Sequence, residues 1–237
     1  MTAPMSMTIA TPDGSFGAYV AEPTGGGLAP AVIVIQEIYG VNAVMRGVAD
    51  HLAGLGYLAV CPDLFWRIEP GIDLTDQTDE GNKRAFDLFG IFNLDKGVED
   101  IAATLAAVRA DPRCNGKVGA VGYCLGGLLA FLTATRTDVD ASVGYYGVSI
   151  DTRLEEVEKL AAPLMLHVAG DDGFVDKDAQ ARMAAGLGNH PNVTLHTYPG
   201  RGHAFARVGG AHYDATDAAL ANQRTEAFFA KTLKCEA

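Results

Sequence analysis

Cys124 lies between two glycines, at the point where an apolar strand-like run changes into a helix-like run. The spacing is Gly122-x-Cys124-x-Gly126, and the glycines leave room for a sharp turn that presents the central side chain. The free N–H groups and positive dipole end of the following helix favour a thiolate and an oxyanion. The motif predicts a nucleophilic cysteine. Its alternative, from the motif alone, is a buried free cysteine that serves only packing.

An acid and a histidine follow Cys124 along the chain. One strand-like run ends just before Asp171 and Asp172, and the next ends just before His203. This order of nucleophile, acid and histidine resembles that of α/β-hydrolases. In such a triad the carboxylate orients the imidazole, which takes or holds the thiol proton. Alone, each aspartate is a candidate turn or N-cap residue and His203 a candidate loop histidine, and the spacing does not choose between the aspartates.

Two backbone N–H groups are candidates for stabilising the oxyanion of an acyl-transfer intermediate. Leu125 directly follows the nucleophile, and Ile38 lies in the loop after the first buried strand. Glu37 is unexpected in that loop, because a carboxylate near a thiol disfavours the thiolate. It is interpreted either as a solvated loop residue or as the group that keeps the thiol protonated until substrate arrives.

The cysteines and the remaining histidines show no metal-site spacing. The four cysteines include no C-x-x-C pair and no zinc-type arrangement with histidine, so no metal or organic cofactor is expected. The first seven residues lack the basic region of a secretory signal, and free thiols suit a reducing compartment, so a cytoplasmic location is expected. Structural or surface roles are predicted for His51, His167, His190, His196 and His212.

Composition suits one soluble α/β domain spanning residues 1–237. The chain of 237 residues is 49% hydrophobic and 20% charged. Its net charge of -11 argues against nucleic-acid and membrane partners, so a small-molecule substrate is expected. If that substrate is anionic, individual cations must be placed to bind it. A monomer or weak oligomer is expected.

Apolar runs alternate with helical patterns along the chain, which predicts a mostly parallel central sheet with helices on both faces. A hairpin is predicted at the N-terminus, where Met5–Ala10 and Ser15–Ala21 flank Pro12-Asp13-Gly14. The uncharged stretch Val118–Thr135 is interpreted as a buried strand and helix rather than a membrane span, because it contains four glycines. A long surface connection is predicted over Phe65–Asn82. Further strands are predicted at Ala31–Ile35, Tyr57–Cys61, 117–122, Asp140–Tyr146, Pro163–Ala169 and Val193–Tyr198, and helices at Val41–Leu55, 82–92, 96–110, 125–135, 153–160, Lys177–Leu187 and 215–233.

With these residues in view, the chain closely resembles the dienelactone hydrolase (carboxymethylenebutenolidase) family over nearly its whole length. The matching blocks are VIVIQEIYGVN at Val32–Asn42, CPDL at Cys61–Leu64, VGYCLGG at Val121–Gly127, VGYYGV at Val143–Val148 and GHAFAR at Gly202–Arg207. The combination of these blocks is specific, whereas none of them is specific alone.

The resemblance implies a cysteine hydrolase of the α/β-hydrolase fold. It would open the enol-lactone ring of dienelactone, 4-carboxymethylenebut-2-en-4-olide, to maleylacetate in the breakdown of chloroaromatics through chlorocatechols. The family pattern assigns Cys124 as nucleophile and His203 as base. It favours Asp172 over Asp171 through the run from His167 to Val175. It also supports the role of Glu37 as a switch.

The family binds the substrate carboxylate with two arginines. Arg207 matches one of them, with a surface cation as the alternative, whereas Asn82 stands at the other position in an ungapped comparison. Loss of that arginine would weaken a bidentate clamp, since the neighbouring Lys83 does not reproduce the fork. The family's aromatic pocket positions fall on Phe86, Phe89 and Tyr146, and the first two also have the spacing of core packing on a helix.

Two other functions remain open. Asn82 is compatible with a related hydrolase of another lactone or activated ester. A non-catalytic ligand-binding or redox-sensing protein could use Cys124 alone, but it would need neither the acid nor the histidine.

Overall fold

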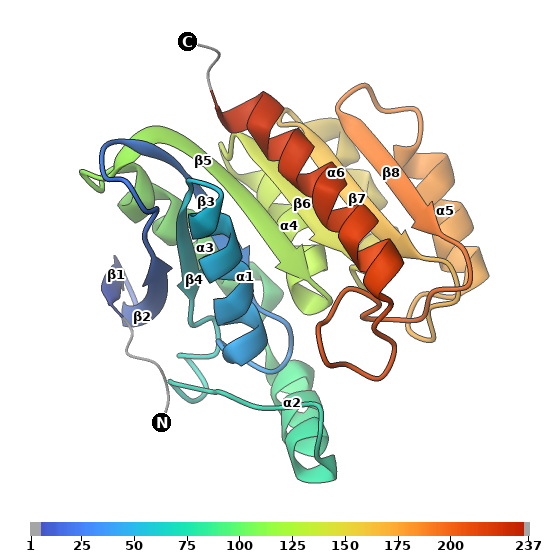
Figure 1. Ribbon diagram of the computed structural model, residues 1–237. Coiled ribbons are helices and arrows are strands. Elements are labelled where there is room, and N and C mark those ends of the chain that lie inside the picture. The colour runs from blue at the N-terminus through green and yellow to red at the C-terminus, as the bar shows by residue number, and fades with distance from the viewer. Residues whose placement is uncertain (1–5, 235–237) are drawn as a thin grey trace. The chain divides into compact units, whose positions relative to one another are not determined.

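The computed structural model describes residues 6–234, and the chain divides into two compact units, residues 1–119 and 120–237 (Figure 1). The strand order is β1-β2-β4-β3-β5-β6-β7-β8 in an eight-stranded mixed sheet, and β5 (Cys114–Tyr123) runs from the first unit into the second. The predicted class, a mostly parallel sheet with an N-terminal hairpin and helices on both faces, is confirmed. The single domain stays a prediction.

The strands of the first unit begin with the hairpin. β1 (Met7–Thr11) and β2 (Gly14–Ala21) pair antiparallel around the two-residue turn at 12–13, and Met5 of the predicted first strand lies outside the described residues. β2 also pairs antiparallel with β4 (Leu58–Pro62), which pairs parallel with β3 (Ala29–Ile35). Every residue of β3 and β4 is buried, as expected for strands covered on both faces.

Side-chain caps begin the three helices of the first unit. Asn42 caps α1 (Ala43–Gly54), Thr78 caps α2 (Asp79–Ile91) and Asn93 caps α3 (Leu94–Arg109). Each cap side chain accepts a hydrogen bond from the backbone N–H three residues later, which satisfies a donor that has no partner within the helix. Figure 1 shows α1 and α3 on opposite faces of the strands in this unit.

The connection before α2 differs from the predicted surface loop. Phe65 is fully buried, and the buried carboxylate of Asp63 accepts hydrogen bonds from the N–H groups of Phe65 and Gly71 at 3.1 and 2.7 Å. Arg67 extends this anchoring by a 2.8 Å ion pair with the fully buried Asp100 on α3. The partner on α3 is distant in sequence, so local composition did not reveal it. Helix α2 also starts at Asp79, three residues earlier than predicted.

The second unit continues the parallel strands. β6 (Ala141–Tyr145), β7 (Leu164–Ala169) and β8 (Val193–Tyr198) pair in parallel, so their carboxyl ends share one edge. Helices α4 (Leu125–Arg136) and α6 (Ala215–Leu233) both pack on β6 and β7, and Figure 1 shows them on opposite faces. Helix α5 (Lys177–Leu187) packs beside β8. Ligands of such sheets bind beyond the carboxyl ends of the strands.

Two further predicted segments are a polar helix and an uncharged stretch. The polar helix predicted at 153–160 is a 3₁₀ helix, η1 (Ile150–Lys159), which starts earlier and has a kink at Arg153 with φ of -130°. It begins after Ser149 in the left-handed region, a backbone change that the polar composition does not signal. The uncharged stretch 118–135 forms strand and helix as predicted, and no helix among residues 6–234 has the length and apolarity to cross a membrane.

Candidate active site

Cys124 occupies a strained turn between β5 and α4. It is the N-cap residue of α4, with φ of 57° and ψ of -114°, a conformation that costs a non-glycine residue about 1–3 kcal/mol. Gly122 makes this turn possible, because a Cβ there would lie 1.9 Å from the carbonyl oxygen of Gly126. The strand–turn–helix geometry predicted from the glycine spacing is therefore present.

The start of α4 fixes the backbone on both sides of the sulfur. The Cys124 N–H donates to the carbonyl of Tyr145 at 3.1 Å, and the Cys124 carbonyl accepts from Gly127 at 3.0 Å. Leu125 is the first residue of the helix, where N–H groups have no acceptor within the helix. This position suits its predicted role as an oxyanion donor.

The structure separates the two candidate acids. The Nδ1 atom of His203 lies 2.8 Å from Oδ2 of Asp172, and both side chains are buried. The other oxygen of Asp172 accepts the N–H of Phe174 at 2.8 Å, which fixes the carboxylate plane. Asp171 is exposed and forms a 2.8 Å ion pair with Lys177. The histidine and Asp172 thus meet beyond the ends of β8 and β7.

The surroundings of His203 favour its protonated form. Burial lowers its pKa, but the hydrogen bond that its Nδ1–H donates to Asp172 and the interaction with Cys124 act in the opposite direction and together raise the pKa to about 10. Its Nε2 is buried and has no hydrogen-bond partner among residues 6–234. Cys124 is close enough to the ring to raise its pKa, although no hydrogen bond of standard geometry joins the sulfur to Nε2.

Aromatic rings enclose the imidazole. Tyr146 contacts His203 edge-on with ring centroids 5.1 Å apart, and Phe174 does the same at 4.8 Å. Tyr146 is buried with φ of 37°, whereas Phe174 is 59% exposed. Sequence reasoning did not place Phe174 at the site, although its position two residues after Asp172 was a usable signal.

Arg207 is buried, which excludes the interpretation that it is a surface cation. Its N–H donates to the carbonyl of Ala204 at 2.9 Å, and Ala204 has φ of 63°. Arg207 follows His203 by four residues, and this turn keeps the loop between them compact. The predicted role in binding an anionic group stays a prediction.

The remaining site candidates belong to the first unit. Glu37 and Ile38 are buried in the loop after β3, so Glu37 is not a solvated loop residue. The side chain of Gln36 anchors this loop, because its Oε1 accepts the N–H of Leu64 at 3.0 Å. The roles predicted for Glu37 and Ile38 beside the thiol stay predictions.

Asn82 uses both ends of its amide within its own unit. Its Oδ1 accepts the Tyr39 hydroxyl at 2.7 Å, and its Nδ2 donates to the carbonyl of Asp76 at 3.1 Å. These bonds give Asn82 a structural role at the start of α2. Phe86 and Phe89, on the same helix, are 48% and 37% exposed, which excludes core packing as their explanation.

Two of the other histidines, His167 and His212, are held by hydrogen bonds. His212 lies beside the site, with its Nδ1 3.0 Å from the carbonyl oxygen of His203. His167 is buried and hydrogen-bonded through both ring nitrogens. Among residues 6–234, no group of three or more histidine, cysteine or acidic side chains could hold a metal ion.

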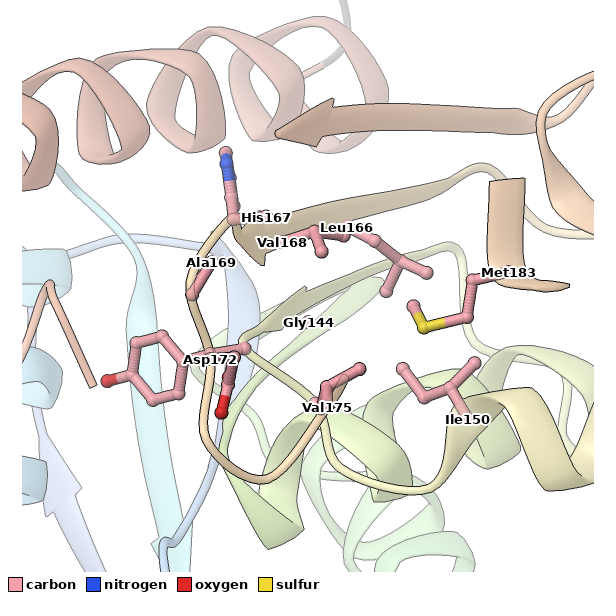
Figure 2. Close-up of a pocket in the computed structure, with 11 residues that line it drawn as sticks. Gly144, Ile150, Leu166, His167, Val168, Ala169, Asp172, Val175 and Met183 are labelled. Carbon is pink, nitrogen blue, oxygen red and sulfur yellow. The ribbon is translucent and has the colours of Figure 1, made fainter. Parts of the chain in front are cut away.

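A small cavity of about 10 Å³, close to the space of a single water molecule, lies beside the acid (Figure 2). Its wall is mostly apolar, with Leu166, Val175 and Met183 in Figure 2, and Asp172 borders it. Cys124 and His203 do not line it. The cavity therefore belongs to the packing behind Asp172 rather than to the space in which substrate would meet the sulfur.

Sequence comparison identifies a family whose model covers most of the chain. The model of the dienelactone hydrolase family matches residues 16–233. A relative from Azospirillum brasilense is 49% identical over 93% of this chain and 95% of its own. A carboxymethylenebutenolidase from Pseudomonas putida is 43% identical over 91% of each chain.

Solved structures show the same fold. A structure from Klebsiella pneumoniae has a TM-score of 0.83 at 24% identity and covers 94% of this chain and 96% of its own. The dienelactone hydrolase from Anabaena variabilis has a TM-score of 0.71 at 17% identity and covers 96% of this chain and 97% of its own. These likenesses establish the α/β-hydrolase fold, and the sequence matches go further: the chain belongs to the dienelactone hydrolase family of hydrolases.

Proposed function

We propose that this protein is a cysteine hydrolase that opens the enol-lactone ring of dienelactone, 4-carboxymethylenebut-2-en-4-olide, to maleylacetate. The observation that carries the proposal is the buried His203–Asp172 pair, 2.8 Å apart, together with Cys124 at the start of α4, which raises the pKa of the imidazole. A relative with 43% identity is named for this activity. The place of the reaction in chloroaromatic breakdown remains part of the proposal.

The first half of the reaction is acyl transfer to sulfur. The Cys124 thiolate attacks the lactone carbonyl, and the resulting oxyanion accepts hydrogen bonds from the N–H of Leu125 and, by the family resemblance, of Ile38. Collapse breaks the ring C–O bond, leaves a thioester on Cys124 and expels the ring oxygen as an enolate. The His203 imidazolium gives its proton to that oxygen.

The second half returns the enzyme to its starting state. His203, now neutral, takes a proton from water, which attacks the thioester carbonyl. The C–S bond breaks, the thiolate is released beside the imidazolium, and one water has been added to the lactone. Asp172 holds the ring through Nδ1 in both halves. In the resting enzyme, we assign Glu37 to keep the thiol protonated. Glu37 takes the thiol proton when substrate binds and returns it to the thiolate after the last step, so the proton count of the cycle closes.

The test is steady-state hydrolysis of cis- and trans-dienelactone. We expect wild type to turn over at least one isomer, Cys124→Ala to lose turnover and Arg207→Ala mainly to raise KM. Turnover that survives intact in Cys124→Ala would refute the nucleophile assignment. A wild-type protein that hydrolyses neither isomer would refute the substrate assignment.

A second candidate substrate class rests on Asn82. Both ends of its amide are hydrogen-bonded to Tyr39 and Asp76, and a neutral amide does not reproduce the charged fork of a carboxylate-binding arginine. This favours a related hydrolase of another lactone or an activated ester. A panel of lactones and esters with and without a carboxylate separates the two, because indifference to the carboxylate would exclude the dienelactone assignment.

Redox sensing by Cys124 is the less favoured function. A sensor needs no buried Asp172–His203 pair. Ligand binding without hydrolysis of any ester or lactone would support it.

A further inference from the structure

A buried chain of hydrogen bonds crosses the second unit behind the candidate triad. His167 lies at its centre, with Nδ1 at 2.7 Å from the Tyr198 hydroxyl and Nε2 at 3.0 Å from the Thr225 hydroxyl. Thr225 continues to the Tyr145 hydroxyl at 2.7 Å. We call these four residues the polar chain. It joins strands β6, β7 and β8 to helix α6, and Figure 2 shows His167 pointing away from the cavity toward that helix.

The two ends of the polar chain fix the direction of its hydrogen bonds. Tyr145 donates its only hydroxyl hydrogen to Oδ1 of Asn222 at 3.0 Å, so Thr225 must donate to Tyr145. Thr225 then has no hydrogen left for His167 and accepts the Nε2–H. At the other end, Arg224 donates to the Tyr198 oxygen at 3.1 Å, and the Tyr198 hydroxyl is free to donate to Nδ1. Every group is satisfied only when His167 is neutral with its hydrogen on Nε2.

The surroundings of His167 agree with this protonation state. The ring is buried, and burial together with His196 and Arg224 holds its pKa well below its usual value. A second proton would remove the acceptor that Tyr198 needs. His167 therefore acts as a fixed connector in the polar chain rather than as a group that titrates near neutral pH.

The backbone of the polar chain contacts all three segments that carry the triad. The Tyr145 carbonyl accepts the N–H of Cys124 at 3.1 Å. The His167 carbonyl accepts the N–H of Tyr146 at 2.7 Å, and the ring of Tyr146 lies edge-on to His203. Tyr198 contacts the segments that carry Asp172 and His203.

The Tyr198 carbonyl accepts from Gly170 at 2.8 Å and from Arg201 at 3.2 Å. Gly170 begins the loop that leads to Asp172, and Arg201 lies in the loop that leads to His203. The ring of Tyr145 also stacks on Tyr123, the neighbour of Cys124, with centroids 4.7 Å apart. A shift of any one member of the polar chain would thus move a triad segment.

We propose that His167 is a positioning residue, and that the polar chain sets the register of the Cys124, Asp172 and His203 segments relative to one another. The proposal deepens the proposed function, on which its kinetic readout rests. It does not require that the substrate be dienelactone, because the reactivity of Cys124 reports on the same geometry.

The main test removes the middle of the polar chain with Thr225→Val, which keeps the side-chain shape. We expect kcat to fall about tenfold with KM little changed, because misplacing catalytic groups by 1 Å can cost about 10²-fold. The rate of Cys124 alkylation by iodoacetamide should fall in parallel, since His203 no longer sits correctly beside the sulfur. Thr225→Ser, which keeps the hydroxyl, should restore both.

Thr232→Val is the matched control. It makes the same change on the same helix, where the hydroxyl donates to the carbonyl of Phe228 at 2.8 Å and not to the polar chain. Wild-type kcat and alkylation in a folded Thr225→Val would overturn the proposal. If Thr225→Val does not fold, Tyr198→Phe decides in the same way, because it breaks the polar chain and keeps the ring.

Nitrogen-15 NMR of the histidine rings directly tests the direction of the hydrogen bonds in the polar chain. We expect His167 to be neutral with its hydrogen on Nε2 at pH 7, and a hydrogen on Nδ1 or on both nitrogens would overturn the direction. If wild type hydrolyses no dienelactone, the proposed function fails. The alkylation rates and the ring tautomer still decide the positioning role.

Discussion

Asp171 and Asp172 are adjacent in sequence but have opposite partners. Asp172 is buried 2.8 Å from His203, whereas Asp171 is exposed 2.8 Å from Lys177. An exposed ion pair contributes little to stability, about 0–1 kcal/mol, while a carboxylate behind a catalytic imidazole fixes its tautomer and stabilises its charge. Substitution of Asp172 therefore tests the catalytic role, and the same substitution of Asp171 is its control.

Asp172→Asn should reduce kcat for the proposed reaction by about 10²–10⁴-fold, because an amide no longer stabilises the imidazolium. Steady-state kinetics on an activated ester or dienelactone measures this. Asp171→Asn should leave kcat within about twofold, since it disturbs only an exposed pair. Equal losses in the two variants would contradict the assignment of Asp172.

The charge on His203 should make stability depend on alkaline pH. Its pKa in the folded state, about 10, lies above the unfolded value near 6.5, so folding favours the protonated form. This contribution is fully present below about pH 6.5 and is lost as pH rises toward about 10. Urea unfolding at pH 7 and pH 9.5 should therefore show a larger loss of unfolding free energy in wild type than in His203→Gln. Equal losses would mean that His203 is neutral in the folded protein.

Glu37→Gln should speed alkylation of Cys124 by iodoacetamide if Glu37 keeps the thiol protonated at rest. The amide has no negative charge to oppose a thiolate, so we expect an increase of about tenfold at pH 7, the effect of about 1.4 kcal/mol. Glu80→Gln is the control, because Glu80 is exposed on α2. A Glu37→Gln rate equal to that of wild type would remove the switch from the mechanism.

Gly122→Ala should destabilise the fold, because its Cβ would lie 1.9 Å from the Gly126 carbonyl oxygen. We expect a loss of about 1–3 kcal/mol in the free energy of unfolding, measured by urea denaturation, together with lost activity. Gly173→Ala is the control, since a Cβ there has nothing within 4 Å. A Gly122→Ala protein as stable as wild type would show that the turn can relax.

The regular elements could be predicted from sequence because local patterns determine them. α5 and β8 have the predicted bounds, and the glycine spacing around Cys124 gave the turn at the start of α4. The order of Cys124, an aspartate and His203 placed the site at the carboxyl ends of strands. These signals depend on periodicity, glycines and chain order, all of which are visible in one sequence.

Features that depend on distant partners could not be predicted. The choice of Asp172 needed a family resemblance, because an acid pair after a strand looks the same whichever member meets the histidine. The anchoring of the connection before α2 depends on Asp100, more than 30 residues from Arg67. The polar chain was likewise hidden, since His167 in a strand gives no sign of the threonine on α6 that it bonds.

Helix α4 is buried along its first eleven residues, Leu125–Thr135. A helix enclosed on every side cannot slide or tilt without disrupting the interior. The position of the Cys124 sulfur, at the start of this helix, is therefore fixed. Redesign for another substrate must therefore work around a stationary nucleophile. The segments available for that purpose are those near His203 that reach solvent, such as the turn with Phe174 and the loop after Arg207. Engineering effort belongs in those segments, and libraries that vary α4 should yield mostly unfolded protein.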